Sequence, residues 1–227
     1  MDERDRDAMK RRASEHAITV IEDGDVVGLG TGSTAEHAIR LLGQEVEAGL
    51  DIVGVPTSFQ ARQIAIDEGI DLTTLDEVDA LDIAIDGADQ FAGSDLVKGG
   101  GAAHAREKVV AAAAERLVIV ADSTKRSDVL DEPVPLEVIP DARTTVARSV
   151  RELGGEPILR SAVRKSGPVV TDNGNLVFDC DFGEIADPAA LGRDLASLPG
   201  VVEHGLFPGF ADEIYVGTAD GVVVVEP

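Results

Sequence analysis

Several residue types are scarce in this chain, and each scarcity narrows what the protein can be. Its 227 residues include no tryptophan and one tyrosine, so aliphatic side chains and alanine must build the interior. The single cysteine, Cys180, cannot form an internal disulfide. No apolar run approaches the roughly 18 residues of a membrane-spanning helix, and the polar start MDERDRDAMKRR is unlike a signal peptide. We therefore expect a cytoplasmic globular protein with no membrane partner.

Positive charge is scarce as well. The chain has 20 Lys and Arg residues against 43 Asp and Glu residues, a net charge of −23, and only five of the bases are lysines. Such a surface repels phosphate backbones, so we expect no nucleic-acid partner. Acidity spread along the whole chain, with little lysine, resembles proteins from salt-loving cytoplasms, where screening relieves the self-repulsion. An ordinary acidic protein is the alternative.

Short apolar runs alternate with helical patterns over the first 130 residues of the chain. The runs lack polar alternation, as parallel strands covered on both faces do. They are DVVGLG (25–30), LDIVGVP (50–56), ALDIAID (80–86) and RLVIVAD (116–122). An opening helix around residues 5–22 precedes them, and helical patterns lie between them. This order predicts an α/β fold with a doubly wound, mostly parallel sheet.

The pattern changes near DEPVPLEVIP, where prolines bound a strand. A helix (ARTTVARSVRELGG), a hairpin turning at Asn173-Gly174 and a second helix (PAALGRDLASLPG) follow. We expect a small α+β domain over residues 131–205. The tail DEIYVGTADGVVVVEP predicts a hairpin across Asp220-Gly221 that returns to the first domain, which would then comprise residues 1–130 and 206–227.

Polar, chemistry-bearing residues follow each predicted parallel strand. GTGST follows the first, PTSFQ the second, DGAD the third and ADSTK the fourth. Ligands of open parallel sheets bind outside the carboxyl ends of the strands, so these segments are expected to meet at one rim. A candidate site is therefore predicted there.

The first of these segments, GLGTGSTAEH, is typical of a phosphate-binding turn. Glycines permit a tight turn, and Ser33 and Thr34 open a helix whose N–H groups and dipole favour an anion. The dinucleotide fingerprint requires a glycine where Ser33 stands, and no Gly-Lys-Ser/Thr of a Walker motif occurs. A small phosphorylated ligand fits better than NAD or ATP, and a plain capped helix is the bland alternative.

Two further segments carry ionisable groups. Asp86 and Asp89 flank Gly87-Ala88 directly after a buried strand and could accept hydrogen bonds from sugar hydroxyls or shuttle a proton. Alternatively they form a solvated acidic turn, and a metal site is a further alternative, although no histidine joins them. Lys98 precedes a run of three glycines, residues 99–101, that could present N–H groups to a developing oxyanion. Glu107, inside the next helix, is a candidate base or a surface partner of its basic neighbours.

These segments in this order resemble the A type of ribose-5-phosphate isomerase. The resemblance rests on GLGTGSTAEH, DGADQ, LVKGGGAAHAREK and VADSTK, and continues through PLEVIP, GGEPILR, VVTDNGN, LPGVVEHGLF and GTADG over nearly the whole chain. It implies a Rossmann-like domain with a smaller ferredoxin-like α+β domain, in a homodimer or homotetramer. It also implies cofactor-free interconversion of D-ribose 5-phosphate and D-ribulose 5-phosphate through an enediolate, in the non-oxidative branch of pentose phosphate metabolism. No metal is expected, because Lys98 and backbone donors can meet the enediolate charge.

The resemblance also implies a role for each matching position. Glu107 would be the catalytic base, with Asp86 and Lys98 as further catalytic residues. Lys10 matches a phosphate-contacting lysine. Gln90 and His104 depart from the family's usual residues. Substrate would be bound by Thr31, Gly32, Ser33, Thr34, Asp86, Gly87, Ala88, Asp89, Lys98, Gly99, Gly100, Gly101 and Lys125.

Two other function classes share parts of this pattern. A sugar-phosphate-sensing domain of a transcription regulator could use the same rim, but it would need a DNA-binding module, which the net charge opposes. A coenzyme A transferase relative also uses a glutamate, but it would normally be larger and form a thioester. An isomerase assay separates the three.

Overall fold

The computed structural model describes residues 2–226, and contacts divide the chain into two compact units. The larger unit contains residues up to Ala88, Arg106–Lys125 and the chain from Phe210 onward. The smaller unit contains Asp89–Ala105 and Arg126–Gly209. The sequence placed residues 89–105, 126–130 and 206–209 in the first domain, whereas contacts group them with the smaller unit. The division of the chain into two domains stays a prediction.

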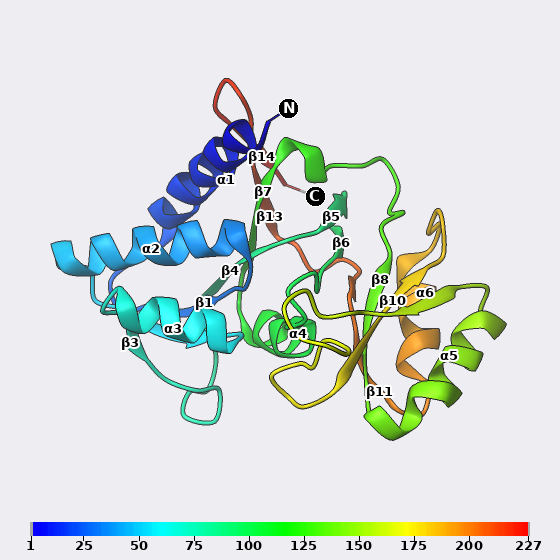
Figure 1. Cartoon of the computed structure of the whole chain (residues 1–227). Coiled ribbons are helices and arrows are strands. Elements are labelled where there is room, and N and C mark those ends of the chain that lie inside the picture. The colour runs from blue at the N-terminus through cyan, green and yellow to red at the C-terminus, as the bar shows by residue number, and fades with distance from the viewer. Residues whose placement is uncertain (1, 227) are drawn as a thin grey trace. The chain divides into compact units, whose positions relative to one another are not determined.

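The larger unit is built on a seven-stranded sheet in the order β14-β13-β7-β4-β1-β2-β3 (Figure 1). All neighbouring pairs are parallel except β13 and β14. The four apolar runs form β1 (Val26–Leu29), β2 (Val53–Pro56), β4 (Ile83–Gly87) and β7 (Leu117–Asp122), and the tail forms β13 (Glu213–Gly217) and β14 (Val222–Val225). The predicted doubly wound α/β sheet and the returning hairpin are confirmed. The two-residue edge strand β3 (Asp71–Leu72) was not predicted.

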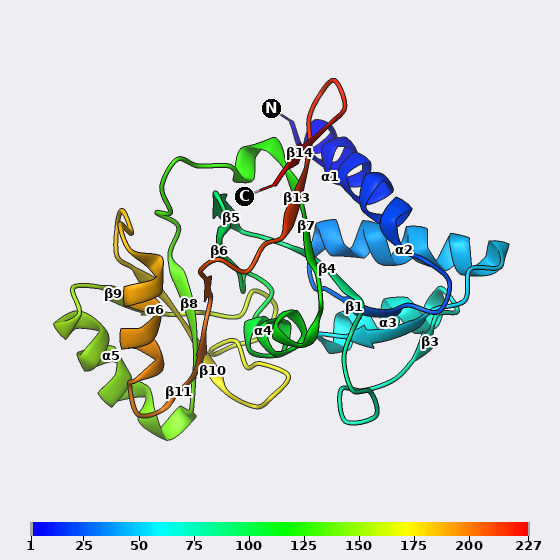
Figure 2. The same ribbon diagram turned by 180° about the vertical axis from the view of Figure 1, so that it is seen from behind.

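Helices cover both faces of this sheet. Figures 1 and 2 show α1 (Glu3–Ala17), α2 (Ser33–Ala48) and α3 (Phe59–Asp67) on one side of the strands and α4 (His104–Ala113) on the other. The first three share a core with the strands that includes Leu29, Leu42 and Tyr215. Strands β2 and β3 are added to the sheet on one side of β1, and the following strands β4 and β7 are added on the other side. The topological switch point is therefore between β1 and β4, where ligands of such sheets bind.

The smaller unit contains a four-stranded antiparallel sheet in the order β11-β8-β10-β9. Its elements follow as β8 (Val134–Val138), α5 (Arg143–Glu152), β9 (Glu156–Leu159), β10 (Leu176–Asp181), α6 (Pro188–Ala196) and β11 (Val201–His204). This βαββαβ order with strand order 4-1-3-2 is the predicted ferredoxin-like arrangement. Its own core joins the strands to both helices through side chains such as Leu136, Val146 and Leu195.

The hairpin predicted at Asn173-Gly174 is only partly right. The turn is there, closed by the N–H of Thr171 on the carbonyl of Asn175. Only the bridge Val170–Leu176 flanks it, however, and β10 pairs with β8 and β9 instead. The run before the turn contains Pro168, which cannot donate to a ladder.

A three-stranded antiparallel sheet, also within the smaller unit, was not anticipated. It consists of β12 (Leu206–Phe207), β6 (Asp95–Val97) and β5 (Gln90–Ala92). Its strands are two or three residues long, too short for a periodic signal. It matters because β6 leads directly into the loop that begins at Lys98.

Candidate active site

The turn after β1 has the geometry of an anion site. Gly32 has φ +106°, a left-handed conformation that disfavours other residues, and it directly precedes Ser33, the first residue of α2. The first N–H groups of this 16-residue helix therefore face the turn. Nothing lies within 4 Å of the position that a Cβ of Gly32 would take. The turn is open on that side.

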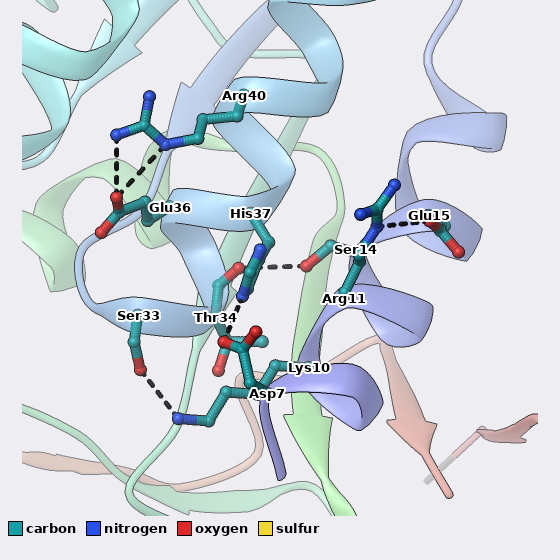
Figure 3. A network of polar contacts seen from close by, with 10 residues as sticks. All are labelled: Asp7, Lys10, Arg11, Ser14, Glu15, Ser33, Thr34, Glu36, His37 and Arg40. Atoms are coloured by element: carbon teal, nitrogen blue, oxygen red, sulfur yellow. Dashed lines mark hydrogen bonds and ion pairs between the residues drawn. The ribbon is translucent and has the colours of Figure 1, made fainter. Parts of the chain in front are cut away.

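Helix α1 holds the beginning of α2 in place (Figure 3). Lys10 donates from Nζ to the hydroxyl of Ser33 at 2.9 Å, and buried Ser14 donates to the carbonyl of Thr34 at 3.0 Å. One turn further along α2, His37 contacts Asp7 at 2.8 Å. A lysine ammonium thus lies beside the hydroxyl that opens the helix, which adds positive charge to the helix N-terminus.

Thr31 connects three strand ends. Its N–H donates to Asp86 Oδ1 at 3.0 Å, and its hydroxyl lies 2.7 Å from the hydroxyls of both Thr57 and Ser58. Thr57 and Ser58 follow β2 and are buried, and Ser58 also caps α3 through the N–H of Ala61. The sequence marked this segment as part of the rim but did not select these two hydroxyls. The signal for them was only their place directly after a parallel strand.

Asp86 and Glu107 line the same narrow crevice of the larger unit. Asp86 ends β4 and Glu107 lies in the first turn of α4, and their exposed fractions are 4% and 3%. Small residues make this approach possible. A Cβ on Gly28 would lie 2.7 Å from Val110 of α4, and a Cβ on Gly30 would lie 2.2 Å from Asp86 Oδ1. Two buried carboxylates at the switch point therefore share one site.

The other predicted residues of the larger unit lie at the same end of neighbouring strands. Gly87 donates its N–H to Asp86 Oδ1 at 2.7 Å, and Ala88 follows it. Lys125 closes a short 3-10 helix (Ser123–Lys125) directly after β7, the neighbour of β4. The order of the strands thus gathers segments that are far apart in sequence.

The smaller unit holds the rest of the predicted residues. Asp89 accepts the N–H of Gly100 at Oδ2, 2.7 Å away. Lys98 is 2% exposed, its N–H donates to the carbonyl of Gly205 at 2.8 Å, and its Nζ lies 5.6 Å from the centre of the Phe207 ring. Gly100 and Gly101 are exposed. Lys98 is thus buried together with Gly99, while the next two glycines of the loop are exposed.

Both departures from the usual family residues have a local structural account. His104, fully buried, donates from Nε2 to the carbonyl of Glu203 at 3.3 Å. A Cβ on Gly99 would lie 2.7 Å from its ring, and Gly99 has φ +107°, so glycine is required there. Gln90 accepts the N–H of Asp131 through its Oε1. Its Nε2 donates to the side chain of the same aspartate, and an ionised glutamate has no donor for this second bond.

Residues 2–226 contain neither a metal-ligand cluster nor a membrane-spanning helix. Within that range no three His, Cys, Asp or Glu side chains cluster as metal ligands would. In the same range no helix is both long and apolar enough to cross a membrane.

Residues 53–221 match the family model described as ribose 5-phosphate isomerase A (phosphoriboisomerase A). The chain belongs to the ribose 5-phosphate isomerase A family. Two relatives named ribose-5-phosphate isomerase A, from Haloarcula marismortui and Natronomonas pharaonis, are each 66% identical over 218 residues. That is 96% of this chain in both cases, and 95% and 96% of theirs. Most of the relatives with high identity are from halophilic archaea, which agrees with the acidic composition.

Solved structures of ribose 5-phosphate isomerases resemble the chain over at least 96% of its length. The enzyme from Methanocaldococcus jannaschii is 42% identical, with a TM-score of 0.93 over 96% of this chain and 98% of that one. A D-ribose-5-phosphate isomerase in complex with phospho-erythronic acid is also 42% identical, with a TM-score of 0.96 over 100% of both chains. The family and the fold inferred from the sequence motifs are confirmed.

Proposed function

We propose that this chain interconverts D-ribose 5-phosphate and D-ribulose 5-phosphate, an aldose–ketose isomerisation of the non-oxidative pentose phosphate branch. Family membership supports this activity, and so does the solved relative whose ligand is a phosphorylated four-carbon acid. The structural observation that carries the proposal is the pair of buried carboxylates, Asp86 and Glu107, lining one crevice. Isomerisation needs two proton transfers, one between oxygens and one between carbons.

The phosphate binds at the turn after β1. Thr31, Gly32, Ser33 and Thr34 supply hydroxyls and helix N-terminal N–H groups, and Lys10 lies 2.9 Å from the Ser33 hydroxyl with its positive charge. Lys125 closes the site. The ligand of this turn is a sugar phosphate and not a nucleotide, because the turn has neither the dinucleotide fingerprint nor a Walker lysine.

The sugar reacts beside the two carboxylates. Asp86, whose Oδ1 is held by two backbone N–H groups, assists opening of the furanose ring by moving a proton between oxygens. Glu107 then removes the proton at C2, which gives a cis-enediolate, and returns a proton at C1. Gly87, Ala88 and Asp89 contact the sugar. A positioned base of this kind contributes about 10²–10⁴-fold to the rate.

The enediolate oxygen needs positive charge. Lys98 and the N–H groups of Gly99 and Gly101 supply it, as preorganised donors do for oxyanions, while the N–H of Gly100 holds the sugar-contacting Asp89. Because these groups can meet the developing charge, the reaction is proposed to need no metal or organic cofactor. Activity should survive exhaustive chelation and dialysis. Loss on chelation, reversed by a divalent ion, would instead make Asp86 and Asp89 candidate metal ligands.

The deciding experiment removes the proposed base. Glu107→Gln keeps the shape of the side chain, so turnover of ribose 5-phosphate should fall by about 10²–10⁴-fold while substrate binding changes far less. Glu115→Gln makes the same chemical change on an exposed side chain just after α4 and should leave turnover as it is. Near-wild-type turnover of the Glu107 variant would clear this residue. Binding of the sugar phosphate by wild type without any turnover would favour a sensor domain over an enzyme.

We also propose that the chain acts as a cytoplasmic homodimer or homotetramer, as implied by the resemblance to the family. Sedimentation equilibrium in a series of KCl concentrations measures the mass directly. A monomer at every salt and protein concentration would contradict the assembly.

A further inference from the structure

Arg160, which follows β9 in the smaller unit, contacts both a carboxylate and the glycine loop. Its Nε donates to Asp179 Oδ2 at 2.9 Å, and its Nη2 pairs with the other oxygen of the same carboxylate. Its Nη1 donates to the carbonyls of Gly99 and Gly100, at 2.9 and 3.0 Å. The arginine side chain is 17% exposed and that of Asp179 is 31% exposed. The Arg160 guanidinium therefore pairs with a carboxylate of β10 and donates to the carbonyls of two successive glycines.

These contacts fix the direction of two amide groups. In a planar trans peptide the C=O and the following N–H point in opposite directions. With the carbonyls of Gly99 and Gly100 turned toward Arg160, the N–H groups of Gly100 and Gly101 are turned away from it. The N–H of Gly100 points away from Arg160 and donates to Asp89 Oδ2 at 2.7 Å. A run of glycines has wide conformational freedom, so an external restraint is what gives this loop one orientation.

The contacts also strengthen the donors. A cation at the carbonyl oxygen draws electron density from the peptide, and hydrogen-bonded chains polarise one another in this way. Asp179 grips the guanidinium in the bidentate form that only the planar fork of arginine allows. A lysine would carry the charge but could not bind Asp179 in two places and still reach both carbonyls.

We propose that Arg160, held by Asp179, is a positioning residue of the isomerisation. It aims and polarises the N–H of Gly101 for the enediolate oxygen, and through the N–H of Gly100 it sets the position of Asp89. The proposal rests on the proposed function, in which this loop stabilises the enediolate. Arg160 acts on the developing negative charge only through the loop, so it serves the transition state more than the bound substrate.

The experiment compares Arg160→Lys and Asp179→Asn with wild type in thermal stability and in three kinetic measurements. The first two are kcat and KM for ribose 5-phosphate, and the third is the inhibition constant of phospho-erythronic acid, whose carboxylate imitates the oxygens of the enediolate. We expect kcat to fall about 10- to 100-fold in Arg160→Lys, up to the roughly 10²-fold cost of a misplaced catalytic group and below the roughly 10²–10³-fold cost of a removed oxyanion donor. Inhibitor binding should weaken in step while KM stays near wild type. Asp179→Asn should show a smaller fall of the same kind.

The matched control is Arg151→Lys. Arg151 pairs with Glu156 at 3.3 Å in the same unit, but that pair is exposed and touches no glycine loop, so its kinetics should be those of wild type. Wild-type kcat and inhibitor binding in Arg160→Lys would overturn the positioning role. A different result would also overturn it: both variants lose kcat, show a higher KM and are destabilised to the same extent. That result would indicate a general structural defect. The proposed function fails separately, if the wild-type protein itself does not isomerise ribose 5-phosphate.

Discussion

Asp86 joins the end of β4 to the turn after β1, because its Oδ1 accepts the N–H of Thr31 at 3.0 Å. The same oxygen accepts the N–H of Gly87 at 2.7 Å. A residue proposed to move a proton is thereby fixed against the proposed phosphate turn at the switch point of the sheet. The structural and the chemical roles of this carboxylate can be separated by experiment.

Asp86→Asn should lower turnover of ribose 5-phosphate by about 10²-fold, since the amide can still accept the two N–H groups but cannot take up a proton. Steady-state kinetics measure this. Asp82→Asn is the matched control and should keep wild-type turnover, because Asp82 also accepts a backbone N–H, that of Val26 at 2.7 Å, but at the opposite end of β1 from Thr31. Near-wild-type turnover of Asp86→Asn, or an equal fall in both variants, would contradict a proton-transfer role for Asp86.

Gly32→Val should weaken phosphate recognition without unfolding the protein. A β-branched residue at φ +106° is strained by about 1–3 kcal/mol, and the turn is expected to relax away from its present geometry. KM for ribose 5-phosphate should therefore rise. Gly49→Val is the control: it ends the same helix at φ +114° and also has nothing within 4 Å of its Cβ position. That variant should lose similar stability with an unchanged KM, and an unchanged KM in both would place the phosphate elsewhere.

Stability should rise with KCl into the molar range. A net charge of −23 on 227 residues produces strong self-repulsion in dilute buffer. The Debye length falls from about 10 Å at 0.1 M to about 3 Å at 1 M, which screens that repulsion. Thermal midpoints measured from low to multimolar KCl test this. A flat or falling series would remove the link between composition and salt while leaving the enzymatic proposal intact.

Cys180 should resist thiol reagents while the smaller unit is folded. It is fully buried in β10, and burial, aided by the nearby Asp179 charge, raises the pKa of its thiol to about 12. Reaction requires the thiolate, so labelling at pH 8 should follow unfolding of the strand. Mass spectrometry of labelled protein, with and without denaturant, measures it, and this single cysteine makes the readout unambiguous. Rapid labelling of the native protein would mean that β10 opens readily.

Glu213 should make stability depend on pH in the acid range. A hydrogen bond from Tyr215 and the pairing with Arg116 lower the pKa of this carboxyl, although partial burial opposes the shift. A lowered folded-state pKa stabilises the fold above the unfolded value, which is about 4.3 for glutamate, and this contribution is lost as pH falls through the folded value. The unfolding free energies of wild type and Glu213→Gln should therefore differ at pH 6 and converge toward pH 3. A constant difference would contradict the assignment.

The local pattern of the chain determined much of the fold. Long apolar runs without polar alternation identified β1, β2, β4 and β7 as buried parallel strands, because such strands are covered on both faces. The motifs identified the family, and their positions after strands predicted a shared rim. Each of these inferences rests on neighbours in sequence, which is where helix caps, turns and strand periods have their physical origin.

Other features were decided only by tertiary contacts. Thr57 and Ser58 read as ordinary loop hydroxyls until β2 is placed beside β1, which brings them to Thr31. Arg160 lies 60 residues from Gly100, and the short strands around Lys98 have no periodic signal. The sequence named the glycine loop, but the direction of its N–H groups depends on a guanidinium and a carboxylate brought to it by strand pairing. Hydrogen bonds between distant residues have no local pattern, so only the folded chain defines them.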